Sequence, residues 1–157
     1  MSAAGLALRA VSRFYATPCF PPGAGPDYAN AAVRVSTPES PEKILGLLHG
    51  IEQDFGRERK QRWGMRSLDL DLVAALHPLV LPDVATQMHW RDLPVADQMQ
   101  AAPDRLILPH PRLQDRAFVL GPMCDIAPAW RHPVTGRSTM QMWAALHARD
   151  RADITPF

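Results

Sequence analysis

Alternation of apolar and polar positions predicts two strands near the start of the chain. Residues 5–14 (GLALRAVSRF) mix small, β-branched and aromatic residues with alternating polar positions, which favours a strand. Residues 17–27 (TPCFPPGAGPD) predict a loop, because their prolines and glycines remove amide donors and interrupt regular structure. Residues 28–36 (YANAAVRVS) alternate again. The pattern is therefore a strand, a long loop and a second strand.

A helical period begins after Ser40. Pro41 is typical of a helix start and Gly56 of a helix end. The apolar positions between them are Ile44, Leu47, Leu48, Ile51 and Phe55. Residues 56–66 have no apolar period and predict a loop, whereas residues 67–74 (SLDLDLVA) alternate and predict a strand.

The second half of the chain predicts fewer regular elements. Residues 75–104 have no clear period and read as a long excursion, which usually indicates either function or disorder. We predict a helix over residues 113–126, a tight turn between two short strands at 131–138, and an amphipathic helix over 138–150. The inward positions of that last helix are Met142, Trp143 and Leu146.

The order of these elements indicates one layered domain over residues 1–157, in the α/β or α+β class. A length of 157 residues suits a single domain with its own core. The composition is ordinary for a globular protein, with 46% hydrophobic and 21% charged residues. A formal charge of +1 gives no general attraction to nucleic acid or anionic membrane. Any charged ligand must therefore be bound by a local cluster of charged side chains.

Cysteine usage and the first residues indicate a cytoplasmic protein. Cys19 and Cys124 are too few for a disulfide framework and have no metal-ligand spacing, which favours a reducing compartment. The opening segment contains Arg9 and Arg13 within its apolar part and no cleavage site, so it predicts no export signal. No apolar run reaches the roughly 18 residues that span a bilayer.

Asp69 and Asp71 are the first candidate functional residues. On a strand they share one face, while Leu68, Leu70 and Leu72 point toward the core. Two carboxylates this close repel each other, and a divalent cation or a shared proton relieves the repulsion. The alternative is a half-exposed strand with solvated acids.

A basic segment directly precedes these aspartates. Its five cations are Arg57, Arg59, Lys60, Arg62 and Arg66. Guanidinium groups suit phosphate oxygens, so an arginine loop beside a carboxylate pair is what phosphoryl or nucleotidyl transfer needs. The alternatives are a solvated basic loop, or single-stranded nucleic-acid binding with Trp63 as a stacking platform.

Two further polar groups stand elsewhere in the sequence. His110, Arg112 and Arg116 lie beside prolines, where they would suit the same nucleotide, although a histidine between prolines is more often structural. A second group could line a slot for a flat heterocycle, since aromatic faces grip such a ring and an amide reads its edge. Its members are Tyr28, Asn30 and Phe118.

The segment RWGMRSLDLDL (62–72) resembles the R-W-G-x-R-(S/T)-L-D-L-D signature of the 6-hydroxymethyl-7,8-dihydropterin pyrophosphokinase family. The flanking segments also resemble the family, in the family's order. They are FYATPCF (14–20), PDYANAAV (26–33), IEQDFGRERK (51–60) and LPHPRLQDRAFVLGPMCDIAP (108–128). The resemblance implies an α+β fold, a ferredoxin-like αβα sandwich with a mainly antiparallel sheet, helices on both faces and long catalytic loops.

The resemblance implies a reaction and a set of site residues. A pterin hydroxymethyl oxygen attacks the β-phosphorus of ATP, pyrophosphate is transferred and AMP leaves, with two Mg²⁺ ions held by Asp69 and Asp71. The other implied catalytic residues are Arg57 and Arg66. The implied ATP-binding residues are Arg59, Trp63, Arg105, His110 and Arg116, and the implied pterin-binding residues are Thr17, Pro18, Phe20, Tyr28, Asn30 and Phe118. The implied partners are these two small molecules, with neither nucleic acid nor membrane, and the implied oligomeric state is a monomer.

The sequence departs from the family pattern at several positions. Phe20, His49 and Ile107 replace residue types common in the family, and Glu52 matches it. The family's N-terminal strand and helix are absent from the sequence, so we expect the natural polypeptide to start upstream. The alternative function is then an inactive remnant that binds nucleotide or pterin but lacks the contribution of that strand.

Overall fold

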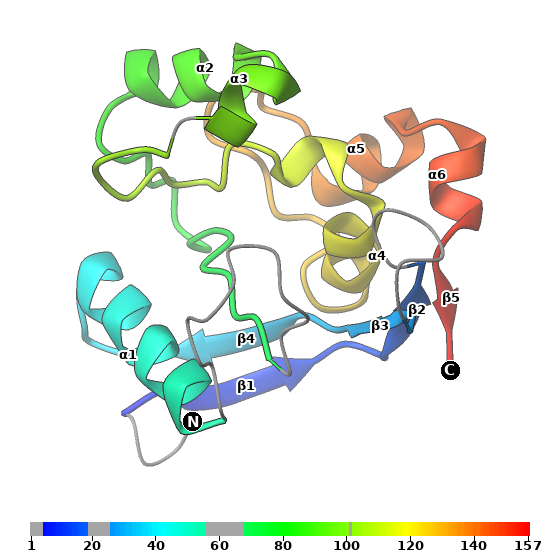
Figure 1. Ribbon diagram of the computed structural model, residues 1–157, viewed down its shortest axis with the longest axis horizontal. Coiled ribbons are helices and arrows are strands. Elements are labelled where there is room, and N and C mark those ends of the chain that lie inside the picture. Colours follow the sequence, from blue (N-terminus) through cyan, green and yellow to red (C-terminus); the bar gives the residue numbers. More distant parts are fainter. Residues whose placement is uncertain (1–4, 19–25, 56–67, 101) are drawn as a thin grey trace.

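The computed structural model describes residues 5–18, 26–55, 68–100 and 102–157. Two small antiparallel sheets and a set of helices make up this part of the chain (Figure 1), which confirms the α+β class. Strand β1 (Ala7–Val11) pairs with β4 (Val33–Ser36), and β2 (Tyr15–Thr17) lies between β3 (Tyr28–Asn30) and β5 (Thr155–Pro156). Figure 1 shows α1 (Pro41–Asp54) beside the first sheet, with the remaining helices on the other side of the molecule.

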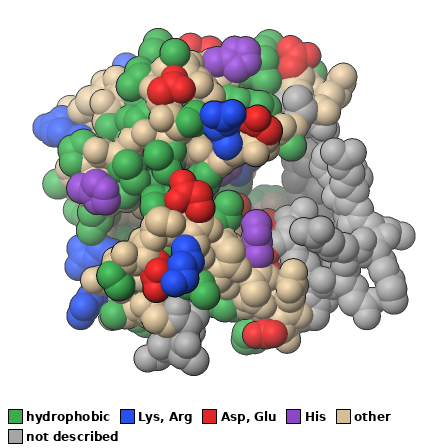
Figure 2. Space-filling view, turned by 90° about the vertical axis from the view of Figure 1, so that its left-hand side faces the viewer, with side chains coloured by type: hydrophobic (Ala, Val, Ile, Leu, Met, Phe, Trp, Pro, Cys, Tyr) green, Lys and Arg blue, Asp and Glu red, His purple; other side chains and the backbone are tan. Residues whose placement is uncertain are grey.

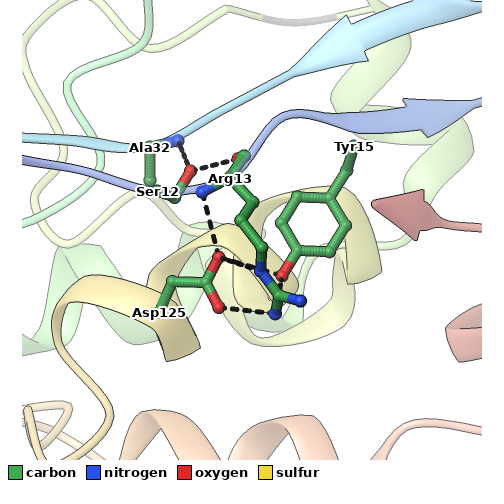
Figure 3. Close-up of polar contacts among 5 residues, drawn as sticks. All are labelled: Ser12, Arg13, Tyr15, Ala32 and Asp125. Atoms are coloured by element: carbon green, nitrogen blue, oxygen red, sulfur yellow. Dashed lines mark hydrogen bonds and ion pairs between the residues drawn. The ribbon is translucent and has the colours of Figure 1, made fainter. Parts of the chain in front are cut away.

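The two predicted N-terminal strands differ from the structure in different ways. Residues 5–14 contain β1 alone, and β2 follows them in the other sheet, whereas residues 28–36 divide into β3 and β4. The residues that follow β1 and β3 lie side by side. The Ser12 hydroxyl accepts a hydrogen bond from the Ala32 N–H at 2.9 Å and donates one to the Arg13 carbonyl at 2.6 Å (Figure 3). The first prediction is therefore confirmed over residues 7–11 but extends too far, and the second is wrong at residues 31–32.

A charged network joins the chain between β1 and β2 to helix α4 (Ala117–Ile126). The Arg13 Nε and backbone N–H both donate to one Asp125 oxygen at 3.1 Å, and its terminal nitrogen donates to the other at 2.8 Å (Figure 3). The Tyr15 hydroxyl also donates to Asp125, at 3.0 Å. These bonds hold the pKa of the Asp125 carboxyl below its ordinary value, Arg13 being the largest cause. These bonds thus hold the start of β2 against α4.

Helix α1 confirms the helix predicted after Ser40. The Ser40 hydroxyl caps it by accepting from the Lys43 N–H at 3.3 Å, and Pro41 occupies its first turn. Its buried face carries Leu48 and Glu52, one turn apart. A carboxylate therefore lies on the inner face of this helix.

The predicted strand over residues 67–74 is wrong for its described part, because no strand is formed by residues 68–75. Their side chains nevertheless alternate as predicted, with Asp69 and Asp71 exposed and the leucines between them partly buried. The ladder is missing because no neighbouring strand in the described part of the chain lies alongside.

The predicted excursion over residues 75–104 was also wrong, since it contains α2 (Val84–Asp92) and α3 (Val95–Gln100). Asp83 caps α2 by accepting from the Thr86 N–H at 2.8 Å. The buried residue of α2 is Gln87, so no apolar stripe marked the helix in the sequence. Among the described residues, no helix has both the length and the apolar character needed to cross a bilayer.

The C-terminal helices are shorter than predicted. Residues 113–126 divide into a 3₁₀ turn η2 (Leu113–Asp115) and α4, and residues 138–150 into α5 (Thr139–Ala145) and α6 (Ala148–Ala152). The turn predicted at 131–138 is confirmed, although a single bridge replaces the two strands. The main core lies here, and its buried members are Leu113, Leu120, Met123, Trp130 and Met142. Trp143 and Leu146 pack against it as predicted.

Charges on the surface are mixed. On the face shown in Figure 2, acidic and basic side chains are interspersed among hydrophobic ones, as the formal charge of +1 leads one to expect. Of the two cysteines, Cys124 is free and half-buried, and burial raises the pKa of its thiol to about 11. This thiol is therefore protonated at neutral pH.

His132 is a buried titratable group in the C-terminal turn, with 0% of its surface exposed. Its Nδ1 accepts hydrogen bonds from the Val134 and Thr135 N–H groups at 3.2 and 3.4 Å. Burial first, and then the charge of Arg91, hold the pKa of His132 below its ordinary value. The unfolded chain therefore binds a proton at this residue more readily than the folded chain does.

We expect the free energy of unfolding to fall as the pH drops below about 6.5, the ordinary histidine pKa. The His132 contribution is complete above that pH and is lost toward its lower folded pKa. Urea denaturation at about pH 7.5 and 5.5 measures the change. A His132→Asn variant keeps an acceptor for the turn and should show a smaller difference between the two pH values, whereas exposed His77→Asn should behave like the parent. An unchanged difference in His132→Asn would contradict this account.

Candidate active site

The segment that carries Asp69 and Asp71 is held by a buried carboxylate. Glu52 of α1 is 1% exposed, and its Oε1 accepts the Leu70 N–H at 2.8 Å. Because Leu70 lies between the two aspartates, this bond fixes the backbone that presents both carboxylates to solvent. Two exposed carboxylates therefore lie on a backbone that a buried side chain of α1 holds in place.

His110 and Arg116 lie next to the acidic pair. The His110 N–H donates to the Val73 carbonyl at 2.8 Å, which joins the two segments. Burial lowers the pKa of His110, the charge of Arg116 lowers it further, and the Asp71 charge opposes both. Burial also lowers the pKa of the Arg116 guanidinium, against the opposing charge of Asp71. A carboxylate, an imidazole and a guanidinium thus share one electrostatic environment.

The tautomer of His110 follows from its hydrogen bonds. Its Nδ1 accepts the Arg112 N–H at 3.0 Å, so the proton of the neutral ring is on Nε2. A lowered pKa keeps the ring neutral at physiological pH. His110 can therefore donate one hydrogen bond from Nε2 without bringing a positive charge.

The residues predicted to line a slot for a flat ring come from β2, β3 and α4 in the described part of the chain. Asn30 Nδ2 donates to the buried Thr17 hydroxyl at 2.7 Å, which orients the amide. Tyr28 pairs with Thr17 across the β2–β3 ladder, and Phe118 is 38% exposed with the Arg116 guanidinium 5.5 Å from its ring centre. Pro18 follows β2 and is exposed.

One cavity of about 840 Å³ brings the acidic pair and part of this slot together. Asn30, Asp69, Asp71 and Phe118 all line it. Its volume lies within the range of small-molecule sites, roughly 300–1,000 Å³. A heterocycle beside Asn30 and Phe118 can therefore lie in the same space as a group bound to the carboxylates.

The remaining predicted site residues lie either outside the described cavity lining or outside the described residues. Arg105 bonds to Asp104 at 3.4 Å, and its charge acts on Asp83 at the start of α2, outside the cavity lining that the structure describes. Its assignment to ATP binding stays a prediction. The others lie outside the described residues and are Phe20, Arg57, Arg59, Trp63 and Arg66.

Comparison with known proteins now gives the family. The family model for 7,8-dihydro-6-hydroxymethylpterin-pyrophosphokinase matches residues 1–128. The chain belongs to this pyrophosphokinase family. The match includes every one of the predicted site residues, from Thr17 to Phe118.

The similar proteins include two pyrophosphokinases and one bifunctional protein. A 2-amino-4-hydroxy-6-hydroxymethyldihydropteridine pyrophosphokinase of Synechocystis is 37% identical over 139 residues, which cover 88% of this chain and 60% of that protein. The Pseudomonas aeruginosa protein of that name is 36% identical over 138 residues, covering 88% and 72%. A mitochondrial folate synthesis bifunctional protein of Arabidopsis is 36% identical over 101 residues, 64% of this chain and 14% of that protein. The chain thus spans about 60% of the Synechocystis pyrophosphokinase.

The chemistry of the acidic pair fits a magnesium ion. Mg²⁺ prefers oxygen ligands and is commonly held by one or two carboxylates together with substrate phosphates and water. Asp69 and Asp71 supply two exposed carboxylates. Within the described ranges, no group of three or more histidine, cysteine or acidic side chains is placed to hold a metal by itself. The pair therefore suits a metal that takes its remaining oxygen ligands from outside these two side chains.

Sequence reasoning missed three supports of the site. Glu52 was recognised only as matching the family, although a glutamate one turn from buried Leu48 signals a carboxylate on an inner helix face. The Thr17–Asn30 bond has no local signal, because loop residues separate the two strands. The anchoring of Arg13 by Asp125 joins residues 112 positions apart, which no local pattern predicts.

Proposed function

We propose that this chain transfers the pyrophosphoryl group of ATP to the hydroxymethyl group of 6-hydroxymethyl-7,8-dihydropterin. The hydroxymethyl oxygen forms a bond to the β-phosphorus, the bond from that phosphorus to the α–β bridging oxygen breaks, and AMP leaves with that oxygen. The hydroxyl proton is released. The observation that carries the proposal is the single cavity shared by Asp69, Asp71, Asn30 and Phe118 in a chain of this family.

The residues of the chain divide the task. Asn30, oriented by Thr17, would hydrogen-bond the edge of the pterin, and Phe118 would contact its face. Arg116 and the Nε2–H of His110 would contact phosphate oxygens beside Asp71. Arg57, Arg66, Arg59 and Trp63 remain proposed phosphate and nucleotide contacts from the basic segment, with Arg105 as a further one.

Asp69 and Asp71 would hold Mg²⁺, with two ions proposed. When bound with ATP, the metal would neutralise phosphate charge and stabilise the charge that develops on the leaving AMP. The buried Glu52 carboxylate would keep the Asp69–Asp71 backbone in place through its hydrogen bond with the Leu70 N–H. We further propose a monomer acting in the cytoplasm.

The competing function is a remnant that binds nucleotide or pterin without turnover. AMP formation from ATP and Mg²⁺, measured with and without the dihydropterin, separates the two. AMP that depends on the pterin supports transfer. Binding of both substrates without AMP would instead support the remnant.

Thr17→Val is expected to weaken pterin binding more than it slows the reaction. The variant keeps the shape of the side chain but removes the hydroxyl that accepts the Asn30 amide hydrogen, so Asn30 loses its orientation. We expect the KM for the pterin to rise about tenfold while kcat changes by about twofold or less, which corresponds to roughly 1.4 kcal/mol of lost binding. Steady-state kinetics with the pterin varied measure both constants. Thr155→Val, at an exposed position outside the cavity lining, is the control, and an unchanged KM in Thr17→Val would contradict this role.

A further inference from the structure

The indole ring of Trp130 holds one end of the acidic segment, which is defined here as residues 68–75. The Trp130 Nε1–H donates a hydrogen bond to the Ala75 carbonyl at 2.7 Å, between residues 55 positions apart. Ala75 is partly buried, and residues 76–78, which follow it, are exposed. The indole bond therefore fixes the backbone at the point where the chain leaves the acidic segment and turns toward solvent.

Three hydrogen bonds from separate parts of the fold hold the acidic segment. Glu52 of α1 accepts the Leu70 N–H at 2.8 Å, and the His110 N–H donates to the Val73 carbonyl at 2.8 Å. The Trp130 bond adds a third point beyond Val73. A backbone fixed at successive points keeps its side chains in one geometry before a ligand binds, so each bond contributes to the placement of the acidic pair.

Trp130 is itself held firmly in the fold. It is 9% exposed and belongs to the main core. Its backbone N–H donates to the Ala127 carbonyl at 3.1 Å, and its carbonyl accepts the Thr139 N–H at 2.9 Å. The buried Thr139 hydroxyl also donates to the Ala127 carbonyl, at 2.8 Å. These bonds join Trp130 to the end of α4 and the start of α5, so the direction of its indole N–H is set by the core.

Packing and hydrogen bonding by Trp130 are separable. Its ring fills space in the core, which another aromatic ring can also do. Its N–H meets the Ala75 carbonyl, and a phenylalanine ring has no donor for that oxygen. Without the bond, the acidic segment could shift relative to His110 and Arg116, on both of which the charge of Asp71 acts.

We propose that Trp130 is a positioning residue, whose indole N–H keeps the acidic segment where Asp69 and Asp71 hold the metal. The inference rests on the proposed function for the role of these two carboxylates. The family model matches residues 1–128, so Trp130 lies in the part of the chain beyond that match. The turn after α4 thus acts on the reaction through the acidic segment and not by contact with the reacting atoms.

Trp130→Phe removes the donor and keeps an aromatic ring in the core. In the full chain we expect kcat for AMP formation to fall about tenfold and the half-saturating Mg²⁺ concentration to rise about tenfold, because small misplacements of a site are costly. The KM for the pterin should stay within about twofold of the parent value. Trp143→Phe is the matched control, since Trp143 packs against the same core outside the described cavity lining, and it should keep the parent constants.

Amide hydrogen exchange gives a readout that needs neither turnover nor metal. Without Mg²⁺ or ATP, exchange at residues 70–75 should be about tenfold faster in Trp130→Phe and unchanged in Trp143→Phe. If the parent chain forms no AMP, the proposed reaction fails, and the exchange rates alone then decide whether Trp130 anchors the acidic segment. Faster exchange confined to Trp130→Phe supports the anchoring, and unchanged exchange overturns it.

A tryptophan analogue removes the N–H alone and decides the question if Trp130→Phe does not fold. 3-Benzothienylalanine keeps two fused rings but has sulfur in place of the N–H, so at position 130 it should reproduce the changes in kcat, Mg²⁺ requirement and exchange. It is introduced by ligating a synthetic peptide of residues 124–157, which begins at Cys124, to the preceding chain. The same ligation with tryptophan is the control. Parent-like constants and exchange in the analogue, or equal changes in Trp143→Phe, would overturn the proposal.

Discussion

Asp71→Asn is expected to lower the rate of AMP formation by about a hundredfold or more. The substitution keeps the size of the side chain but removes a charge that acts on both His110 and Arg116 and that is proposed to hold the metal. Loss of about 3 kcal/mol of transition-state stabilisation corresponds to this factor. Steady-state AMP formation at saturating ATP and Mg²⁺ measures it.

Pterin binding is the internal comparison for this variant. Asp71 serves the phosphates and the metal in this account, so the Kd for the dihydropterin should stay within about twofold of the parent value. Asp97→Asn, at an exposed position in α3, is the matched control and should retain full activity. A loss of pterin affinity as large as the loss of rate would contradict the assignment of Asp71.

Glu52→Ala is expected to reduce both activity and stability. The Leu70 N–H would lose its 2.8 Å bond to a fully buried carboxylate, and an unsatisfied buried donor costs about 1–3 kcal/mol. The backbone that presents Asp69 and Asp71 would no longer be fixed, so we expect AMP formation to fall about tenfold or more. Urea denaturation and AMP formation measure the two effects.

The conservative variant separates positioning from simple loss of stability. Glu52→Gln retains an oxygen that can accept the Leu70 N–H, so it should recover most of the activity lost in Glu52→Ala. Exposed Gln53→Ala, the next residue of α1, should leave activity and stability unchanged. Full activity in folded Glu52→Ala would show that the bond to Leu70 does not position the acidic pair.

Local chemistry made some elements predictable. Helix α1 could be predicted because Ser40, Pro41 and the apolar period all agree. The exposed positions of Asp69 and Asp71 followed from alternation alone. Helix α2 could not be predicted in this way, because its buried Gln87 replaces the apolar stripe.

Contacts between distant residues explain the rest. The division between β1 and β2 depends on Ala32 and Asp125, which lie far along the chain from Ser12 and Arg13. The strand predicted at 67–74 fails for the described residues because alternation predicts an extended segment but not a neighbour to pair with. Asn30 and Phe118 could be proposed as a pair only from residue type and family resemblance, and the structure places both on one cavity.

Transfer of the β-phosphorus tests the central proposal most directly. ATP labelled with ³²P at the β position is incubated with the chain, Mg²⁺ and 6-hydroxymethyl-7,8-dihydropterin, and the products are separated. We expect the label to move to the pterin while unlabelled AMP forms in equal amount. Label retained in ADP, with only the γ-phosphoryl group on the pterin, would contradict pyrophosphoryl transfer. Label remaining in ATP, with both substrates bound to the folded chain, would contradict catalysis and leave a binding protein.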